Sequence, residues 1–253
     1  MAVKDAIKTL KEKRAAVKDK ADQALLDTAI KDLEERLAQV GKGEPAPEAK
    51  KDEPFDMPKN WELKFNTGKS RPSYNPKTGE LKLMYDFVDV KQLKDFEYAE
   101  DVKPNLQKGV LTLKGGTEIK HVARFRTIEV GGDMLSKYGC VMKIGSYKLR
   151  LNNKPNRGDA YELIEKDREV SHVMLAGGFV GSNTVTLKSW YITPKLVGVK
   201  VGNEDNSARR NESGESLGQL VLCADQAPNS YKRLTITGTL DPEWAKEFFA
   251  DKK

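Results

Sequence analysis

The stretch that decides the fold runs from residue 81 to residue 151 and holds five short segments rich in strand-forming residues. They are Leu81-Lys-Leu-Met-Tyr-Asp-Phe87, Gly109-Val-Leu-Thr-Leu-Lys114, Ile119-Lys-His-Val-Ala-Arg-Phe-Arg-Thr-Ile128, Cys140-Val-Met-Lys-Ile144 and Tyr147-Lys-Leu-Arg-Leu151. Apolar and polar residues alternate in several of them, and glycine or charged residues separate them. This pattern predicts a meandering antiparallel β-sheet, which the rest of the chain either leads into or completes.

Further strand-like segments follow along the chain. They lie at residues 161–164, 172–175, 184–192, 196–201, 219–223 and 234–238, and residues 61–65 are predicted to form a first edge strand. No helical segment separates these strands, whereas a parallel sheet would need crossover helices. The sequence therefore predicts an all-β fold, an antiparallel sandwich of two sheets.

The C-terminal part carries two more predictions. Residues 203–216 are rich in Asn, Ser, Glu and Arg, which predicts a long polar loop. Asp241 followed by Pro242 is typical of a helix start, with Asp as the N-cap and Pro at the first helical position. We expect a short amphipathic helix that lays Trp244, Phe248 and Phe249 on the body of the domain.

The N-terminal part differs in composition from the rest. Residues 1–40 are predicted to be helical, because residues 3–40 lack Pro and Gly and are dense in Ala, Lys, Leu and Glu. Their apolar rhythm changes phase midway, which fits either one helix with a skipped register or a helical hairpin. The apolar stripe needs a partner, so we expect self-association through residues 3–40, as in a coiled coil. Residues 41–58 form a linker of Pro, Ala and charged residues, and residues 59–253 form the sandwich domain.

Bulk composition excludes some classes of function. The chain has 253 residues and a net charge of +6, and none of its apolar runs is long enough to span a membrane. Residues 1–53 hold 12 basic and 12 acidic side chains, so the basic excess lies in residues 54–253. Nucleic acid is not an expected partner, because no recognition helix or ribonucleoprotein-type motif accompanies this mild excess. The first residues contain no hydrophobic signal core. A chain that starts after a removed signal peptide would look the same. The sequence is therefore compatible with an extracytoplasmic location.

The chain has two cysteines, Cys140 and Cys223, and both lie in strand-like apolar runs. They are either two buried thiols or one interstrand disulfide, and the disulfide would imply an oxidising compartment. Neither belongs to a cysteine–histidine cluster, and His121 and His172 fall on separate strands. The sequence therefore predicts no metal site and no cofactor.

Several motifs resemble the concanavalin A-like lectin/glucanase jelly-roll superfamily over about residues 60–240. They are Leu83-Met-Tyr-Asp-Phe87, Leu93-Lys-Asp-Phe96, Gly109-Val-Leu-Thr-Leu-Lys114 and the closing Arg233-Leu-Thr-Ile-Thr-Gly238. The resemblance implies a jelly roll of two curved sheets, whose concave face often holds a glycan. It also implies that the domain need not be an enzyme, because many members of the superfamily are binding modules.

The run Glu165-Lys-Asp-Arg-Glu169 has the Glu-x-Asp-x-Glu spacing of the laminarinase-type enzymes of that superfamily. On a strand, Lys166 and Arg168 would then point into an apolar core, which is unfavourable without partners. The run also lies where a hairpin turn is expected. We therefore predict a solvated hairpin tip and no catalytic residues.

Basic side chains offer a candidate binding surface. Arg124, Arg126, Lys148 and Arg150 alternate outward, and together with Trp190 they would form a basic, partly aromatic trough suited to an acidic glycan. The alternative is ordinary solvent-facing alternation with Trp190 in the core. The leading hypothesis is a non-catalytic lectin-like module for carbohydrate or another surface ligand, tethered or multimerised by its N-terminal helix. The alternatives are a structural or assembly protein that binds another protein, and a glycoside hydrolase.

Overall fold

The computed structural model describes residues 55–135, 139–154, 158–174, 185–210, 216–225 and 227–250, together with Lys11, Glu12, Arg14, Gln23 and Asp27. The chain divides into two compact units, Met1–Asp52 and Glu53–Lys253. Apart from those five residues, which are helical, the predicted N-terminal helical segment lies outside the described residues, as does the linker before residue 55. Among the described residues, no helix has the length and apolar character needed to cross a membrane.

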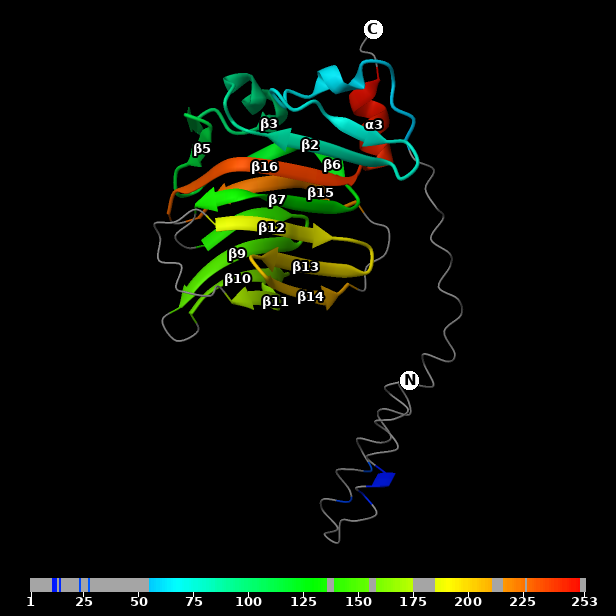
Figure 1. The fold of residues 1–253 in the computed structure, drawn as a ribbon, viewed down its shortest axis with the longest axis vertical. Coiled ribbons are helices and arrows are strands. Elements are labelled where there is room, and N and C mark those ends of the chain that lie inside the picture. Colours follow the sequence, from blue (N-terminus) through cyan, green and yellow to red (C-terminus); the bar gives the residue numbers. More distant parts are fainter. Residues whose placement is uncertain are drawn as a thin grey trace. The chain divides into compact units, whose positions relative to one another are not determined.

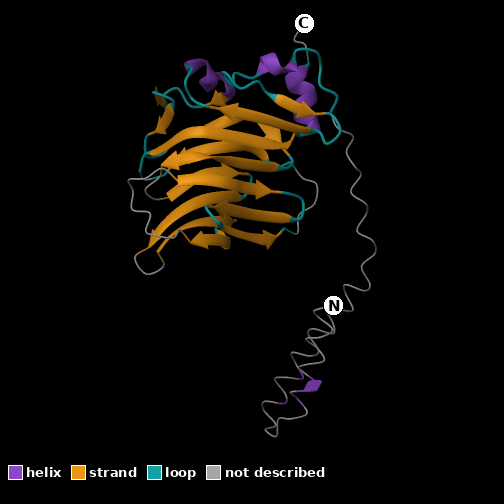
Figure 2. Ribbon diagram, viewed as in Figure 1, coloured by secondary structure: helices purple, strands orange, loops and turns teal. Residues whose placement is uncertain are grey.

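The second unit is a sandwich of two antiparallel sheets (Figures 1 and 2). Among the described residues, sheet A has nine strands, with the order β1-β2-β16-β7-β12-β13-β14, and β5 pairs with both β16 and β4. Their bounds are β1 (Ser73–Asn75), β2 (Glu80–Tyr85), β4 (Asn105–Gln107), β5 (Val110–Leu113), β7 (Ile128–Leu135), β12 (Val185–Ile192), β13 (Leu196–Val201), β14 (Glu204–Arg209) and β16 (Asn229–Thr239).

Sheet B has seven strands within the same described ranges, in the order β11-β10-β9-β8-β15-β6-β3. Their bounds are β3 (Phe96–Glu97), β6 (Thr117–Phe125), β8 (Gly139–Ile144), β9 (Tyr147–Lys154), β10 (Gly158–Glu165), β11 (Arg168–Met174) and β15 (Gly218–Ala224). The predicted all-β fold of two antiparallel sheets is confirmed.

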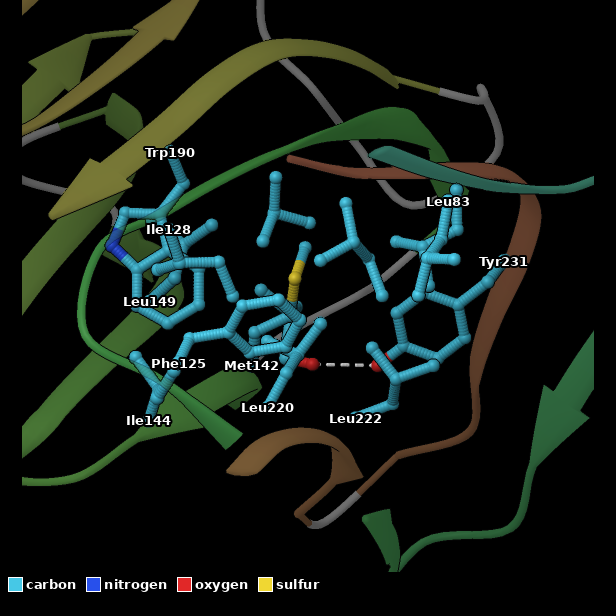
Figure 3. Packing of buried hydrophobic residues seen from close by; sticks show 14 of the residues in the cluster. Leu83, Phe125, Ile128, Met142, Ile144, Leu149, Trp190, Leu220, Leu222 and Tyr231 are labelled. Atoms are coloured by element: carbon cyan, nitrogen blue, oxygen red, sulfur yellow. Dashed lines mark hydrogen bonds between the residues drawn. The ribbon is translucent and has the colours of Figure 1, made fainter. Parts of the chain in front are cut away.

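The core lies between the sheets, where the inward residues of both sheets meet. On β6, the buried residues Ile119, His121, Ala123 and Phe125 alternate with outward ones, as the sequence predicts. Figure 3 shows part of this core, where Tyr231 from β16 lies beside Leu222 from β15.

The C-terminal helix α3 (Pro242–Phe249) begins where the sequence predicts. The Asp241 carboxylate accepts hydrogen bonds from the backbone N–H groups of Glu243 at 2.9 Å and Trp244 at 3.2 Å. These bonds satisfy donors that the first helical turn leaves free. Phe249 is buried, and Trp244 and Phe248 pack against the core, so the expected docking of this helix is confirmed.

The predicted single meander is wrong in its connectivity. From β5 to β8 each step changes sheet, because β5 and β7 belong to sheet A and β6 and β8 to sheet B; among the described strands β5 to β9, only β8 and β9 are consecutive neighbours in one sheet. Alternation of apolar and polar residues is the same for a strand in either sheet. It therefore identifies which side chains face the core and leaves the sheet assignment open.

Two local predictions are also wrong. Residues 61–65 do not form a strand, because Trp61–Lys64 is a 3-10 helix, labelled η1; a second one, η2, spans Val90–Asp95. Strand β14 lies within the predicted polar loop 203–216 and pairs with β13. Since β14 is an edge strand with mostly exposed side chains, it needs no apolar residues and has no strand-like pattern.

Candidate ligand-binding face

The basic residues that the sequence singles out lie on the outer side of sheet B but do not meet. Arg124 is exposed on β6, whereas Lys148 and Arg150 are half-buried on β9. Strands β8 and β15 separate β6 from β9. Three strand spacings place these backbones about 14 Å apart. Arg126 lies in the turn after β6, where its backbone N–H donates to Thr239 O at 2.9 Å.

Acidic side chains accompany these cations. Lys148 Nζ lies 2.6 Å from Asp167 Oδ1, and Arg150 faces Glu162 across the β9–β10 ladder. Between them and Arg124, Lys143 Nζ lies 3.0 Å from Glu118 Oε2. Surface ion pairs of this kind neutralise the local charge and leave no uniformly basic trough.

Trp190 is not on the surface, so the prediction that its ring faces a ligand is wrong. Its side chain is 0% exposed and lies in the core with Phe125, Ile128 and Leu149 (Figure 3). The reason is a register shift in β12 between Leu187 and Trp190. Because such a bulge adds one residue, it turns Trp190 inward and its neighbour outward.

Tyr191 is the aromatic residue that this bulge brings to the outer face of sheet A. It is half-buried and pairs with Glu129 on one side and with Gly198 on the other. A Cβ atom on Gly198 would lie 2.5 Å from Tyr191 Cζ, so the ring occupies the space above that glycine. The phenol therefore lies against the sheet and leaves part of its surface to solvent. Sequence alternation alone misses this residue.

Two adjoining cavities lie on the outer face of sheet A, with volumes of about 340 and 440 Å³. They share Gly132, Thr186 and Thr235. The rest of their combined lining includes Lys82, Met84, Glu129, Gly131, Asp133, Lys188, Arg233 and Thr237, from strands β2, β16, β7 and β12. We call this region the sheet A hollow. Tyr191 is on the same outer face, and its ring lies over Gly198 of β13, on the side of β12 away from β7.

Two glycines on β7 let the adjacent strands pack closely where they line this hollow. A Cβ atom on Gly131 would lie 2.8 Å from the carbonyl oxygen of Lys188, and one on Gly132 would collide with the carbonyl oxygen of Arg233. The neighbouring strands therefore approach β7 more closely than any other residue would allow. The Gly-Gly pair in the sequence is the signal that indicates this close approach.

A partly buried ion pair fixes one end of the sheet A hollow. The Asp133 carboxylate accepts hydrogen bonds from the Thr186 hydroxyl at 2.7 Å and from Arg233 Nε at 2.6 Å. Burial favours a higher pKa for Asp133, but the hydrogen bonds from Thr186 and Arg233 outweigh it and lower the pKa below its usual range. Asp133 therefore stays ionised and holds the largely exposed Arg233 guanidinium at the rim.

Two acidic residues of the hollow, Glu129 and Asp133, are poorly arranged as a catalytic pair for glycoside hydrolysis. Glu129 and Asp133 are four residues apart on β7, which separates them by about 13 Å, beyond the roughly 5–9.5 Å between the two catalytic carboxyl groups of glycosidases. A general acid needs a raised pKa, whereas the pKa of Asp133 is lowered.

The acidic run on sheet B is a hairpin tip, as the sequence predicts. Strand β10 ends at Glu165, and Lys166 and Asp167 form the turn with φ of 48° and 64°. Two successive left-handed residues are typical of a two-residue type I′ turn. The carboxylates of Glu165 and Glu169 therefore do not share one strand.

Comparisons with known proteins concern the fold alone. No protein-family model matches the sequence, and no curated protein matches it. Among solved structures, the chain is similar to a protein of unknown function with a galectin-like fold from Bacillus subtilis, with 7% identity, a TM-score of 0.45, and coverage of 62% of this chain and 94% of that chain. It is similar to a Bacillus licheniformis β-glucanase, with 9% identity, a TM-score of 0.44, and coverage of 61% and 97%. It is also similar to the exoplasmic/lumenal domain of VIP36 in a Ca²⁺/Man3GlcNAc-bound form, with 10% identity, a TM-score of 0.42, and coverage of 59% and 86%.

Proposed function

We propose that this protein is a non-catalytic carbohydrate-binding module that takes its ligand on the outer face of sheet A. The observation that supports this most is the sheet A hollow, with the Tyr191 ring on the same outer face of the sheet. A sugar ring has one apolar face and a belt of hydroxyl groups. It therefore needs an aromatic surface beside several fixed hydrogen-bonding groups.

The lining of the hollow supplies such groups. Thr186 and Thr235 present hydroxyls at its centre, while Glu129 and Arg233 present charged groups at its edges. Because Asp133 already orients the Arg233 guanidinium, the remaining N–H groups are held in place before a ligand arrives. Preorganised donors of this kind reduce the entropy lost on binding.

The basic residues Arg124, Arg126, Lys148 and Arg150 on sheet B form a competing binding surface. The separation of β6 and β9 and the acidic partners of Lys148 and Lys143 favour the sheet A hollow over this surface. An assembly protein that binds another protein through a sheet face is the second candidate function.

A glycan array with the full chain tests the proposal. We expect binding to a defined set of glycans, and a parallel panel of polysaccharides should show no release of reducing ends. Absence of binding to neutral and acidic glycans would leave the assembly function as the better explanation. Steady release of reducing ends would contradict the non-catalytic assignment.

We also propose that residues 3–40 multimerise the module, which would raise its avidity for a repetitive ligand. Among the described helical residues of this part, Arg14 Nε lies 2.6 Å from Asp27 Oδ1. Thirteen residues of one straight helix would span about 20 Å, so Arg14 and Asp27 do not lie on one straight helix. In sedimentation experiments, the full chain should be an oligomer, whereas a chain that starts at residue 41 should be a monomer. If both chains are monomers, this proposal is refuted.

A further inference from the structure

Sheet B has a weak seam between its two central strands. Strands β11, β10, β9 and β8 form one set, strands β15, β6 and β3 form the other, and only the β8–β15 ladder joins them. That ladder pairs Val221 with Lys143 and Leu222 with Met142. The adjacent β8–β9 and β15–β6 ladders each extend over more residues. The pairing of the two sets therefore stops before it reaches Cys140 and Cys223.

Side chains from sheet A occupy the inner side of this seam. Asn229 Nδ2 donates to Cys140 O at 3.1 Å and to Cys223 O at 2.6 Å. The Tyr231 hydroxyl lies 2.6 Å from Val141 O and 2.8 Å from Cys223 O. In a continuous ladder, backbone N–H groups would bind such carbonyls. Here two buried side chains of β16 bind these carbonyls, although β8 and β15 still lie side by side.

The two thiols lie at the same point of the seam. Cys140 Sγ and Cys223 Sγ are 3.3 Å apart, both residues are buried, and neither is in a disulfide. A bulge in β8 between Cys140 and Met142 brings the first thiol toward β15. Neighbouring antiparallel strands have Cα separations of about 4.5–5.5 Å, inside the range that a disulfide accepts.

We propose that Cys140 and Cys223 are a disulfide-forming pair whose bond closes the seam of sheet B. The oxidant is a small-molecule disulfide. One cysteine thiolate attacks it and forms a mixed disulfide, and one thiol leaves. The second cysteine then displaces the other thiol, so two protein thiols lose two protons and two electrons, and the oxidant becomes two thiols. The sulfur atoms need to approach by about 1 Å, because a disulfide bond is about 2.05 Å long.

Burial controls how fast this bond can form. The hydrogen bond with Cys140 and the burial of the thiol both raise the pKa of Cys223, so the folded protein holds very little thiolate there. Exchange in the folded state is therefore expected to be slow. Equilibration during refolding avoids this barrier, because the thiols are then open to solvent.

The test refolds the full chain from urea in buffers with reduced and oxidised glutathione, then blocks free thiols after denaturation and measures the mass. After refolding, we expect neither thiol to react with the blocking reagent. The mass before blocking should be lower than that of the reduced chain by two hydrogens. The midpoint of urea unfolding should be higher for the oxidised form than for the reduced form. Cys140→Ser and Cys223→Ser are matched controls, which should each carry one free thiol or one glutathione. Two blocked thiols, or two bound glutathiones, in the refolded wild-type chain would overturn the proposal.

Discussion

His121 lies fully buried on β6, and its hydrogen bonds define which ring nitrogen carries the proton. Nδ1 accepts from the backbone N–H of Ala123 at 3.0 Å, so the proton is on Nε2. Nε2 lies 2.8 Å from the Tyr85 hydroxyl, and that hydroxyl donates to Asp95 Oδ2 at 2.8 Å. The chain of bonds requires a neutral imidazole, because a charged one would need a second acceptor at Nδ1.

This network predicts that stability falls in mild acid. Burial lowers the pKa of His121 from 6.5 to about 3. Between these values the unfolded chain binds a proton that the folded chain does not, so the stabilisation is complete above pH 6.5 and is lost as the pH falls toward 3. From pH 7.5 to 5.0 the free energy of unfolding should decrease by about 2 kcal/mol, at about 1.4 kcal/mol per pH unit below 6.5. Urea unfolding at both pH values measures this.

Two variants isolate the contribution of His121 from that of other groups. Burial raises the pKa of Asp95, and this shift acts in the opposite direction to that of His121. His121→Gln should largely lose the wild-type pH dependence, whereas His172→Gln, at an exposed position on β11 beside Glu169, removes only a surface ion pair. An unchanged pH dependence in His121→Gln would show that carboxyl groups cause the effect.

At the scale of single elements, the bulge in β12 limits what the sequence can predict about the site. Strict alternation puts Tyr191 on the side of Leu187 and Trp190 on the other, whereas the structure turns Trp190 into the core and Tyr191 outward. A bulge shifts every later residue by one place, and Lys188-Ser189 contains no residue type that announces it. The alternation therefore predicts the strand correctly but assigns the outward position to Trp190 and not to Tyr191.

The sequence correctly predicts the position of the β10–β11 hairpin. The structure adds that the two turn residues have a backbone conformation that lowers stability. Lys166 and Asp167 both have left-handed φ, which Asn and Gly adopt more easily than Lys and Asp. The double variant Lys166→Asn/Asp167→Gly should raise the free energy of unfolding by about 1 kcal/mol. Urea unfolding measures the gain. Asp167→Asn is the matched control, because it removes the ion pair with Lys148 and keeps a residue that tolerates the turn. A less stable double variant would contradict this account.

At the scale of the whole molecule, the sequence predicts the sandwich but leaves the arrangement of its strands undetermined. Residues such as Leu83 and Leu149 share the apolar side of the alternating pattern, and both are fully buried. Their sheet depends on turns such as Arg126-Thr127, through which the chain crosses between layers, and no local pattern encodes that crossing. The sheet A hollow depends on the same arrangement, because it draws on β2, β7, β12 and β16 from distant parts of the chain.

The measurement that tests the central claim most directly is calorimetric titration of Tyr191→Ala with the strongest glycan from the array. Loss of the aromatic surface should weaken binding about tenfold or more, which corresponds to about 1.4 kcal/mol. Tyr98→Ala, which removes an exposed tyrosine elsewhere, and Arg124→Ala, on the outer face of sheet B, should bind within about twofold of wild type. If Tyr191→Ala binds like wild type, or if Arg124→Ala shows the loss instead, the ligand does not bind on the outer face of sheet A around Tyr191.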